Sequence, residues 1–91
     1  MRFRITKHAG HDAPPDAVEK LLASLSGIRS KGRFAKVGSE IRVTWGRDDA
    51  NGWDRPERVE VEREELLELL HRVCRAETGL QLDWYAIGPL D

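Results

Sequence analysis

Two histidines and an aspartate near the N-terminus have the residue types of a metal site. His8, His11 and Asp12 lie close together in the chain, and zinc and related ions bind neutral imidazole and carboxylate groups held by a rigid frame. No CxxC or HExxH pattern accompanies them. The remaining histidine, His71, falls inside a predicted helix. We therefore interpret His8–Asp12 as a polar loop that leads into a helix, and we predict neither a metal nor a cofactor.

A second group of polar side chains falls in a longer predicted loop, Arg47–Glu57. Its DANG segment is similar to part of a calcium-binding loop, but alignment on Gly52 places arginines at the first and twelfth ligand positions, where carboxylates are required. The adjacent carboxylates Asp48 and Asp49 have the types that can share a proton in catalysis. On loops, solvated carboxylate pairs are commoner than catalytic ones, so a catalytic role for this pair stays an alternative interpretation.

Trp53 is the aromatic residue of this loop. A tryptophan among polar residues either folds back over the core or contacts a partner. We keep both readings. An enzymatic or small-molecule site, if the chain has one, is expected beside the Arg47–Glu57 loop or the His8–Asp12 loop.

A β-hairpin over Gly32–Gly46 organises the rest of the pattern. Gly38-Ser39 fits a two-residue turn with glycine first, which fixes the register so that Arg33 faces Thr44. Side chains alternate across a strand. The core face of the hairpin is therefore predicted to carry Phe34, Ile41, Val43 and Trp45.

Two further strands and two helices are predicted around this hairpin. Alternation predicts a strand over Arg2–Lys7, and leucines at helical spacing predict a helix from Pro15 to a left-handed cap at Gly27. A second amphipathic helix is predicted over Glu62–Thr78, ended by Gly79.

The end of the chain alternates over Leu80–Ile87, which predicts a last strand that ends at Gly88. This alternation places Tyr85 and Ile87 on the face opposite Trp84. The short segment Arg58–Val61 also alternates, with its valines inward, and is an optional additional strand.

This order of elements predicts one α+β domain over residues 1–91. A mostly antiparallel sheet of four or five strands, with both helices on one face, covers every apolar stripe. The ferredoxin-like plait, built from two interlocked β-α-β halves, is the leading topology.

A fifth strand would give a different topology. If Arg58–Val61 pairs with the hairpin, the segment Pro14–Thr78 has the order α-β-β-β-α, which resembles that of double-stranded-RNA-binding domains. The resemblance is one of element order, with no shared motif. That family is basic where its second helix begins, whereas this chain has Glu62, Glu64 and Glu65. RNA binding is therefore not carried over.

Composition narrows the class of partner. The formal net charge of −1 argues against electrostatic binding to nucleic acid or to an anionic membrane, and no apolar run is long enough to span a membrane. The single cysteine, Cys74, forms no internal disulfide, and the chain begins with a strand pattern rather than a secretion signal. We expect a cytoplasmic protein, and the excess of arginine over lysine suggests a bacterial one.

The remaining candidate site is the open face of the predicted sheet. Arg4, Arg33 and Arg42 are expected there around Tyr85, and arginines near an aromatic ring could bind phosphate or stack on a base. Only one aromatic residue is expected on this face, so we do not expect nucleic acid. We predict a small, non-catalytic module that binds a protein, or a second copy as a homodimer, through this face. The other residues expected there are Arg2, Thr6, Ala35, Val37, Thr44, Asp83 and Ile87.

Overall fold

The computed structural model describes residues 2–10, 12–46 and 56–90, which form an α+β fold. A single turn of 3-10 helix, η2, precedes the last strand. The elements are, in chain order, β1 (Arg2–Lys7), α1 (Ala17–Ser26), β2 (Gly32–Val37), β3 (Glu40–Trp45), α2 (Pro56–Ala76), η2 (Leu82–Trp84) and β4 (Tyr85–Pro89).

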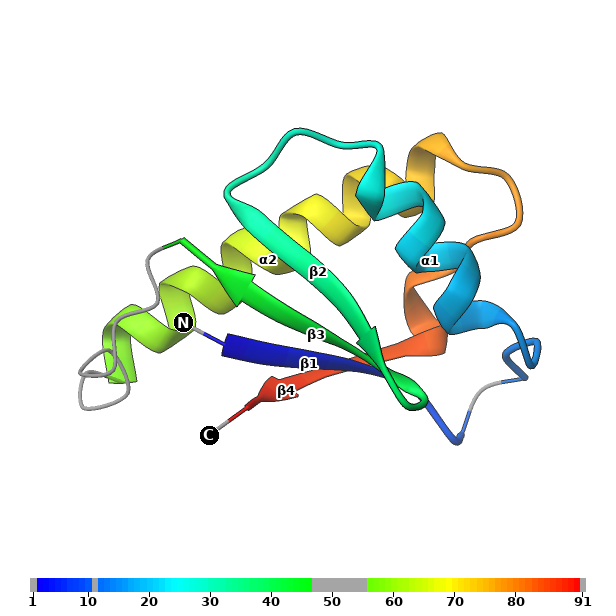
Figure 1. Cartoon of the computed structure of the whole chain (residues 1–91), viewed down its shortest axis with the longest axis horizontal. Coiled ribbons are helices and arrows are strands. Elements are labelled where there is room, and N and C mark those ends of the chain that lie inside the picture. Colours follow the sequence, from blue (N-terminus) through cyan, green and yellow to red (C-terminus); the bar gives the residue numbers. More distant parts are fainter. Residues whose placement is uncertain (1, 11, 47–55, 91) are drawn as a thin grey trace.

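The sheet has four strands in the order β2-β3-β1-β4, and every neighbouring pair is antiparallel. β1 is therefore paired on both sides, and β2 and β4 are the edges (Figure 1). The first half of the chain is β1-α1-β2 and the second half is β3-α2-β4. In the sheet, β3 lies between β1 and β2, and β1 lies between β3 and β4.

Both helices cover the same face of this sheet, and the core lies between the two layers (Figure 1). β1 contributes Phe3 and Ile5, which are fully buried because alternate residues of a strand share one face. Burial of each large apolar side chain is worth about 1.5–3 kcal/mol. The largest fully buried side chains are Phe3, Ile5, Leu21, Leu25, Ile41, Val43, Leu66, Leu70 and Val73.

The predicted hairpin is confirmed. Gly38 has a positive φ of 63°, as the first turn position requires, and Arg33 pairs with Thr44 and Val37 with Glu40. The side chains predicted for the core face are buried or pack against the core. The turn sequence and the alternation therefore agree on one register.

The prediction of an optional strand at Arg58–Val61 is wrong, because these residues belong to the start of α2. Proline suits the first position of a helix, where its missing N–H has no helical partner. The acidic residues that follow suit the positive end of the helix dipole. The five-stranded sheet and the α-β-β-β-α order are wrong for the same reason. The predicted loop Arg47–Glu57 ends earlier than expected, since Pro56 and Glu57 are helical, and residues 47–55 lie outside the described residues.

The two helix ends differ from each other. Gly79 has the predicted left-handed conformation, with φ of 95°. Gly27 does not: its φ is −89°, and the N–H of Ile28 donates to the carbonyl of Leu25 at 3.1 Å. The left-handed cap predicted at Gly27 is therefore wrong, and Ile28 remains 39% exposed.

The side chains of the last strand point to the opposite faces of the sheet from those predicted. Leu82–Trp84 form η2, and β4 runs over Tyr85–Pro89, past the expected end at Gly88. Because the 3-10 turn breaks the alternation, Tyr85 faces the helices, and its hydroxyl donates to the carbonyl of Ala17 at 2.7 Å. The prediction that Tyr85 and Ile87 lie on the open face is wrong.

Gly32, the first residue of β2, tests the packing at the open end of the hairpin. A Cβ there would lie 2.6 Å from two carbons of the Trp45 ring and 2.8 Å from Cζ of Phe34. We expect Gly32→Ala to lower the free energy of unfolding by about 1–3 kcal/mol, as overpacked cores do, in chemical denaturation. Gly88→Ala is the matched control because no heavy atom of the described residues lies within 4 Å of its added Cβ. Equal effects of the two substitutions would contradict this account.

Candidate binding face

The face of the sheet turned away from the helices carries four arginines in the described part of the chain. We call this surface the arginine face. β1 supplies Arg2 and Arg4, which alternate with the buried Phe3 and Ile5. The surface consists of Arg2, Arg4, Thr6, Arg33, Ala35, Val37, Glu40, Arg42, Thr44 and Ala86.

The strand register brings the arginines together in two neighbouring rows across the sheet. Arg4 is the direct partner of Arg42, and Ala35 lies on the other side of Arg42. Arg2 and Arg33 both pair with Thr44, from opposite sides. Adjacent strands lie about 4.8 Å apart. Four guanidinium groups on three adjacent strands therefore have overlapping reach.

One carboxylate of the described residues lies among these arginines. Oε2 of Glu40 is 3.8 Å from Nε of Arg4 and 3.6 Å from Nε of Arg42. Both distances exceed a hydrogen bond, and Nε of Arg4 is buried without a hydrogen-bond acceptor. Among the described residues, the arginine face therefore carries more positive than negative charge, although the whole chain has a net charge of −1.

The arginine face has no aromatic side chain among the residues that the structure describes. Tyr85 is only 7% exposed and lies in the core, so it is not next to Arg4, Arg33 or Arg42 as predicted. Asp83, also expected on this face, lies in η2 instead. Arg4, Arg33 and Arg42 do lie on this open face. The surface can form ion pairs and aliphatic contacts but offers no ring on which a base could stack.

The predicted loop candidates fall partly outside the described residues. Trp53 and His11 lie there. Nδ1 of His8 accepts the N–H of Gly10 at 3.1 Å, which gives this histidine a role in the turn after β1, and Asp12 is exposed. Within residues 2–10, 12–46 and 56–90, no three His, Cys, Asp or Glu side chains are grouped to hold a metal ion.

A polar cluster that the sequence did not predict joins the hairpin to α2. Nζ of Lys31 forms ion pairs with Glu62, at 3.1 Å, and with Glu65. Lys31 also lies 5.5 Å from the centre of the Trp45 ring, whose N–H donates to Glu65 at 3.3 Å. Hydrogen bonding to Lys31 holds the pKa of Glu65 below its usual value, and Glu65 raises the pKa of Lys31. The cluster braces the fold, and no sequence spacing relates these residues.

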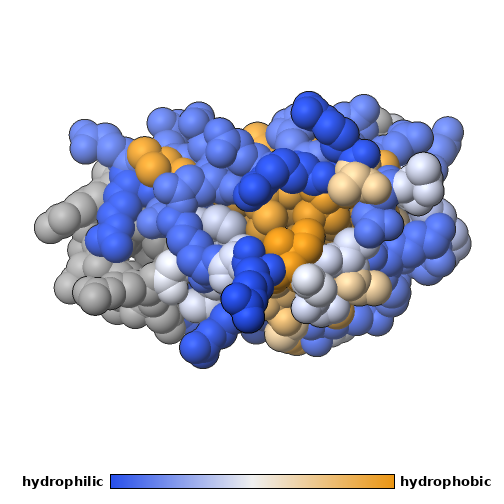
Figure 2. Space-filling view, turned by 90° about the horizontal axis from the view of Figure 1, so that it is seen from above, coloured by the Kyte–Doolittle hydropathy of each residue, from blue (hydrophilic) through white to orange (hydrophobic). Residues whose placement is uncertain are grey.

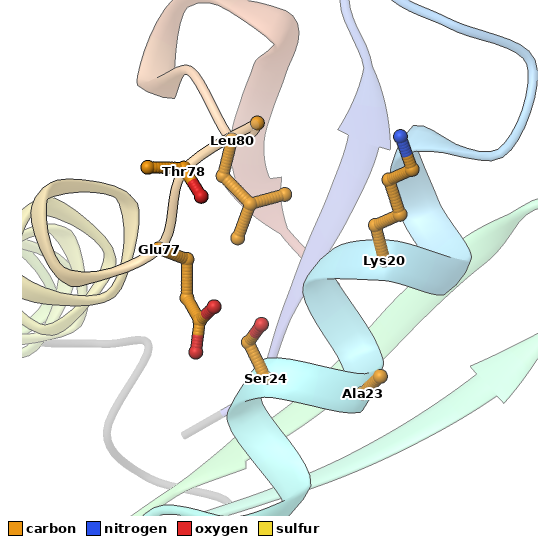
Figure 3. A pocket seen from close by; sticks show the side chains of 7 residues that line it. Lys20, Ala23, Ser24, Glu77, Thr78 and Leu80 are labelled. Carbon is orange, nitrogen blue, oxygen red and sulfur yellow. The ribbon is translucent and has the colours of Figure 1, made fainter.

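A small cleft between α1 and the α2–η2 connection has a volume of about 230 Å³. Figure 3 shows Lys20 and Ser24 on α1 at one side of the cleft, and Glu77, Thr78 and Leu80 at the other. Lys20 at the rim lies 3.8 Å from Asp16. The lining contains no histidine or cysteine, and ligand pockets are usually larger, about 300–1,000 Å³. This cleft is smaller than a usual ligand pocket, and the polar groups of its lining are one amine, one carboxylate and two hydroxyls.

Cys74 is half-buried on α2 and unpaired with other cysteines. Burial raises the pKa of its thiol above the ordinary value. The reactive form of cysteine is the thiolate, so this side chain behaves as a small apolar group.

Comparison with known proteins gives no relative. No protein-family model, curated protein or solved structure matches this chain. Separately, none of the helices in the described ranges combines the length and the apolar character that crossing a membrane requires.

The facing of β4 can be tested through Tyr85, which is the only tyrosine of the chain. Burial, with smaller contributions from Cys74 and Asp16, raises its pKa to about 12. An exposed tyrosine titrates near pH 10. Absorbance at 295 nm should therefore show tyrosinate forming near pH 12 in the folded protein and near pH 10 in denaturant.

The same pKa shift predicts how stability depends on pH. The neutral phenol is favoured in the folded state, so its contribution is complete below about pH 10 and is lost as the pH rises toward about 12. Tyr85→Phe should remove this loss and should lower stability at neutral pH by about 1 kcal/mol, because one buried hydrogen bond is removed. A midpoint near pH 10 in the folded protein would contradict the inward facing of Tyr85.

Proposed function

We propose that this chain is a small, non-catalytic binding module that acts through its arginine face. The observation that carries the proposal is the charge of this surface: among the described residues, four arginines and one carboxylate, that of Glu40, lie on the open face of the sheet. The cytoplasm is the compartment we propose for it, because its one cysteine makes no internal disulfide.

The partner that this chemistry fits is an acidic segment of another protein. Guanidinium groups bind carboxylates through paired hydrogen bonds. Between the arginines, Ala35, Ala86 and the 44% exposed Val37 provide aliphatic contact. Proteins that read single-stranded nucleic acid usually add aromatic rings for stacking. The described part of this face has none, which favours a protein partner over nucleic acid.

Self-association through the arginine face is disfavoured by the same charges. Two copies placed face to face would bring arginines against arginines, and like charges across an interface cost several kcal/mol. We therefore propose an acidic partner, rather than a second copy, for this surface.

For the topology of the module we propose the ferredoxin-like plait. The order β-α-β-β-α-β supports this assignment. It is also supported by the position of one strand from each half between the two strands of the other.

Binding can be tested by fluorescence anisotropy with a fluorescein-labelled polyglutamate peptide. We expect the wild-type protein to bind it, with an affinity that falls as salt is added. Arg4→Gln/Arg42→Gln should weaken binding by about tenfold or more, since two charge-assisted contacts are lost. Both side chains are about half exposed, so the double variant should fold.

The control removes the same charge from the helical layer. Lys20→Gln/Arg63→Gln neutralises two exposed groups on α1 and α2, and it should change affinity by less than about twofold. Equal weakening by the two double variants would show a bulk charge effect and would overturn the proposal. A wild-type protein that does not bind the peptide would do the same.

A further inference from the structure

An apolar groove lies on the opposite side of the molecule from the arginine face, where α2 meets the α1–β2 connection. We call it the flank groove. Figure 2, seen from above the view of Figure 1, shows an apolar patch between hydrophilic margins. The groove has a volume of about 210 Å³ and is lined by Ile28, Arg29, Leu69, Arg72, Val73 and Ala76.

The floor of the flank groove is apolar and its rim is basic. Leu69 and Val73 belong to the core, and the 39% exposed Ile28 adds an apolar wall. Arg72 stands at the rim and also borders a neighbouring open hollow, whose lining includes Glu68, His71 and Arg75. The C-terminal half of α2 therefore presents a hydrophobic slot flanked by two arginines, with one carboxylate, Glu68, beside them.

The N-terminal half of α2 carries the complementary features. Val61 is 57% exposed, more than Ile28 or Val37, the other exposed large apolar side chains of the described residues. It precedes Arg72 by about three turns, so the two lie on the same flank of the helix. The exposed carboxylates Glu57 and Glu64 stand one turn to either side of Val61. Arg58 also lies one turn before Val61, so this half presents an apolar projection flanked by two carboxylates and one arginine.

We propose that two copies of this chain pair through this surface, with their α2 helices antiparallel. A two-fold axis near the middle of α2 would seat Val61 of each copy in the flank groove of the other. The same rotation sets Glu57 and Glu64 opposite Arg72 and Arg75. A symmetric dimer requires one surface that complements itself. In the antiparallel arrangement, each apolar projection meets an apolar groove and each acidic half of α2 meets the basic half of the other copy. The acidic first half and the basic second half identify a second copy as the occupant.

This dimer leaves the arginine face of both copies uncovered, because that face belongs to the sheet and the flank groove to the helical layer. The inference is independent of the proposed function. If both hold, each dimer displays two acid-binding faces, and a partner with two acidic segments would bind more tightly through both.

Sedimentation equilibrium of the full chain measures the pairing. Wild type should dimerise, with dissociation promoted by salt. Arg72→Glu/Arg75→Glu and Glu57→Arg/Glu64→Arg should each raise the dissociation constant of the homodimer by about tenfold or more, because like charges then meet across the axis.

An equimolar mixture of these two variants gives the sharpest result. In the mixed dimer every reversed charge again faces an opposite one, so association should recover to about the wild-type level. Circular dichroism checks that each variant is helical. Val61→Asp, at an exposed position, should also dissociate the dimer and tests the pairing if the reversal of the N-terminal charges unfolds α2.

The matched control reverses two charges on the other layer. Arg33→Glu/Arg42→Glu changes net charge as much as Arg72→Glu/Arg75→Glu and should leave the dimer unchanged. A monomeric wild-type protein, a mixture that fails to recover, or a dimer that only the arginine-face variant dissociates would overturn the proposal.

Discussion

β1 is paired with β3 on one side and with β4 on the other, and this antiparallel pairing determines how side chains are divided between the two faces of the sheet. A strand that is hydrogen-bonded on both sides can expose only its two faces, and alternation divides its side chains between them. Phe3 and Ile5 point to the helices, so Arg2 and Arg4 must point away. A shift of one residue would bury the arginines and expose the core, which makes the register strongly determined.

The sequence predicted those elements whose signals are local. The Gly38-Ser39 turn and the alternation on both sides of it determine the hairpin, and the leucine spacing identifies both helices. The start of α2 was missed because Val59 and Val61 fit a strand pattern as well as a helix. Tyr85 was misplaced because nothing in Leu80–Ile87 indicates the 3-10 turn that breaks the alternation. Its hydrogen bond to Ala17 crosses most of the chain.

The candidate surface was predictable in part, because alternation along a strand is also a local signal. Arg4, Arg33 and Arg42 lie on strands whose alternation is clear, and they are on the open face. The brace between Lys31 and Glu65 was not predictable, because it joins a connection to a helix far along the chain. The excess positive charge of the face also required the structure, since the carboxylates that balance the total charge lie mainly on α2 and the connections.

The two layers of the molecule therefore differ in charge as well as in composition. The sheet presents arginines on its open face, whereas α2 is acidic in its first half and basic in its last turns. Ion pairs on a solvated surface add little to folding. We attribute this difference in charge between the two layers to binding. We propose that the arginine face binds an acidic partner and that the flank of α2 binds a second copy.

Amide NMR during titration with unlabelled polyglutamate identifies the surface that the peptide contacts. We expect chemical-shift changes concentrated on β1, β2 and β3, around Arg4, Ala35 and Arg42, with little change along α1 and α2. Changes centred on the helices, or spread evenly over the molecule, would contradict a binding surface made by the open face of the sheet.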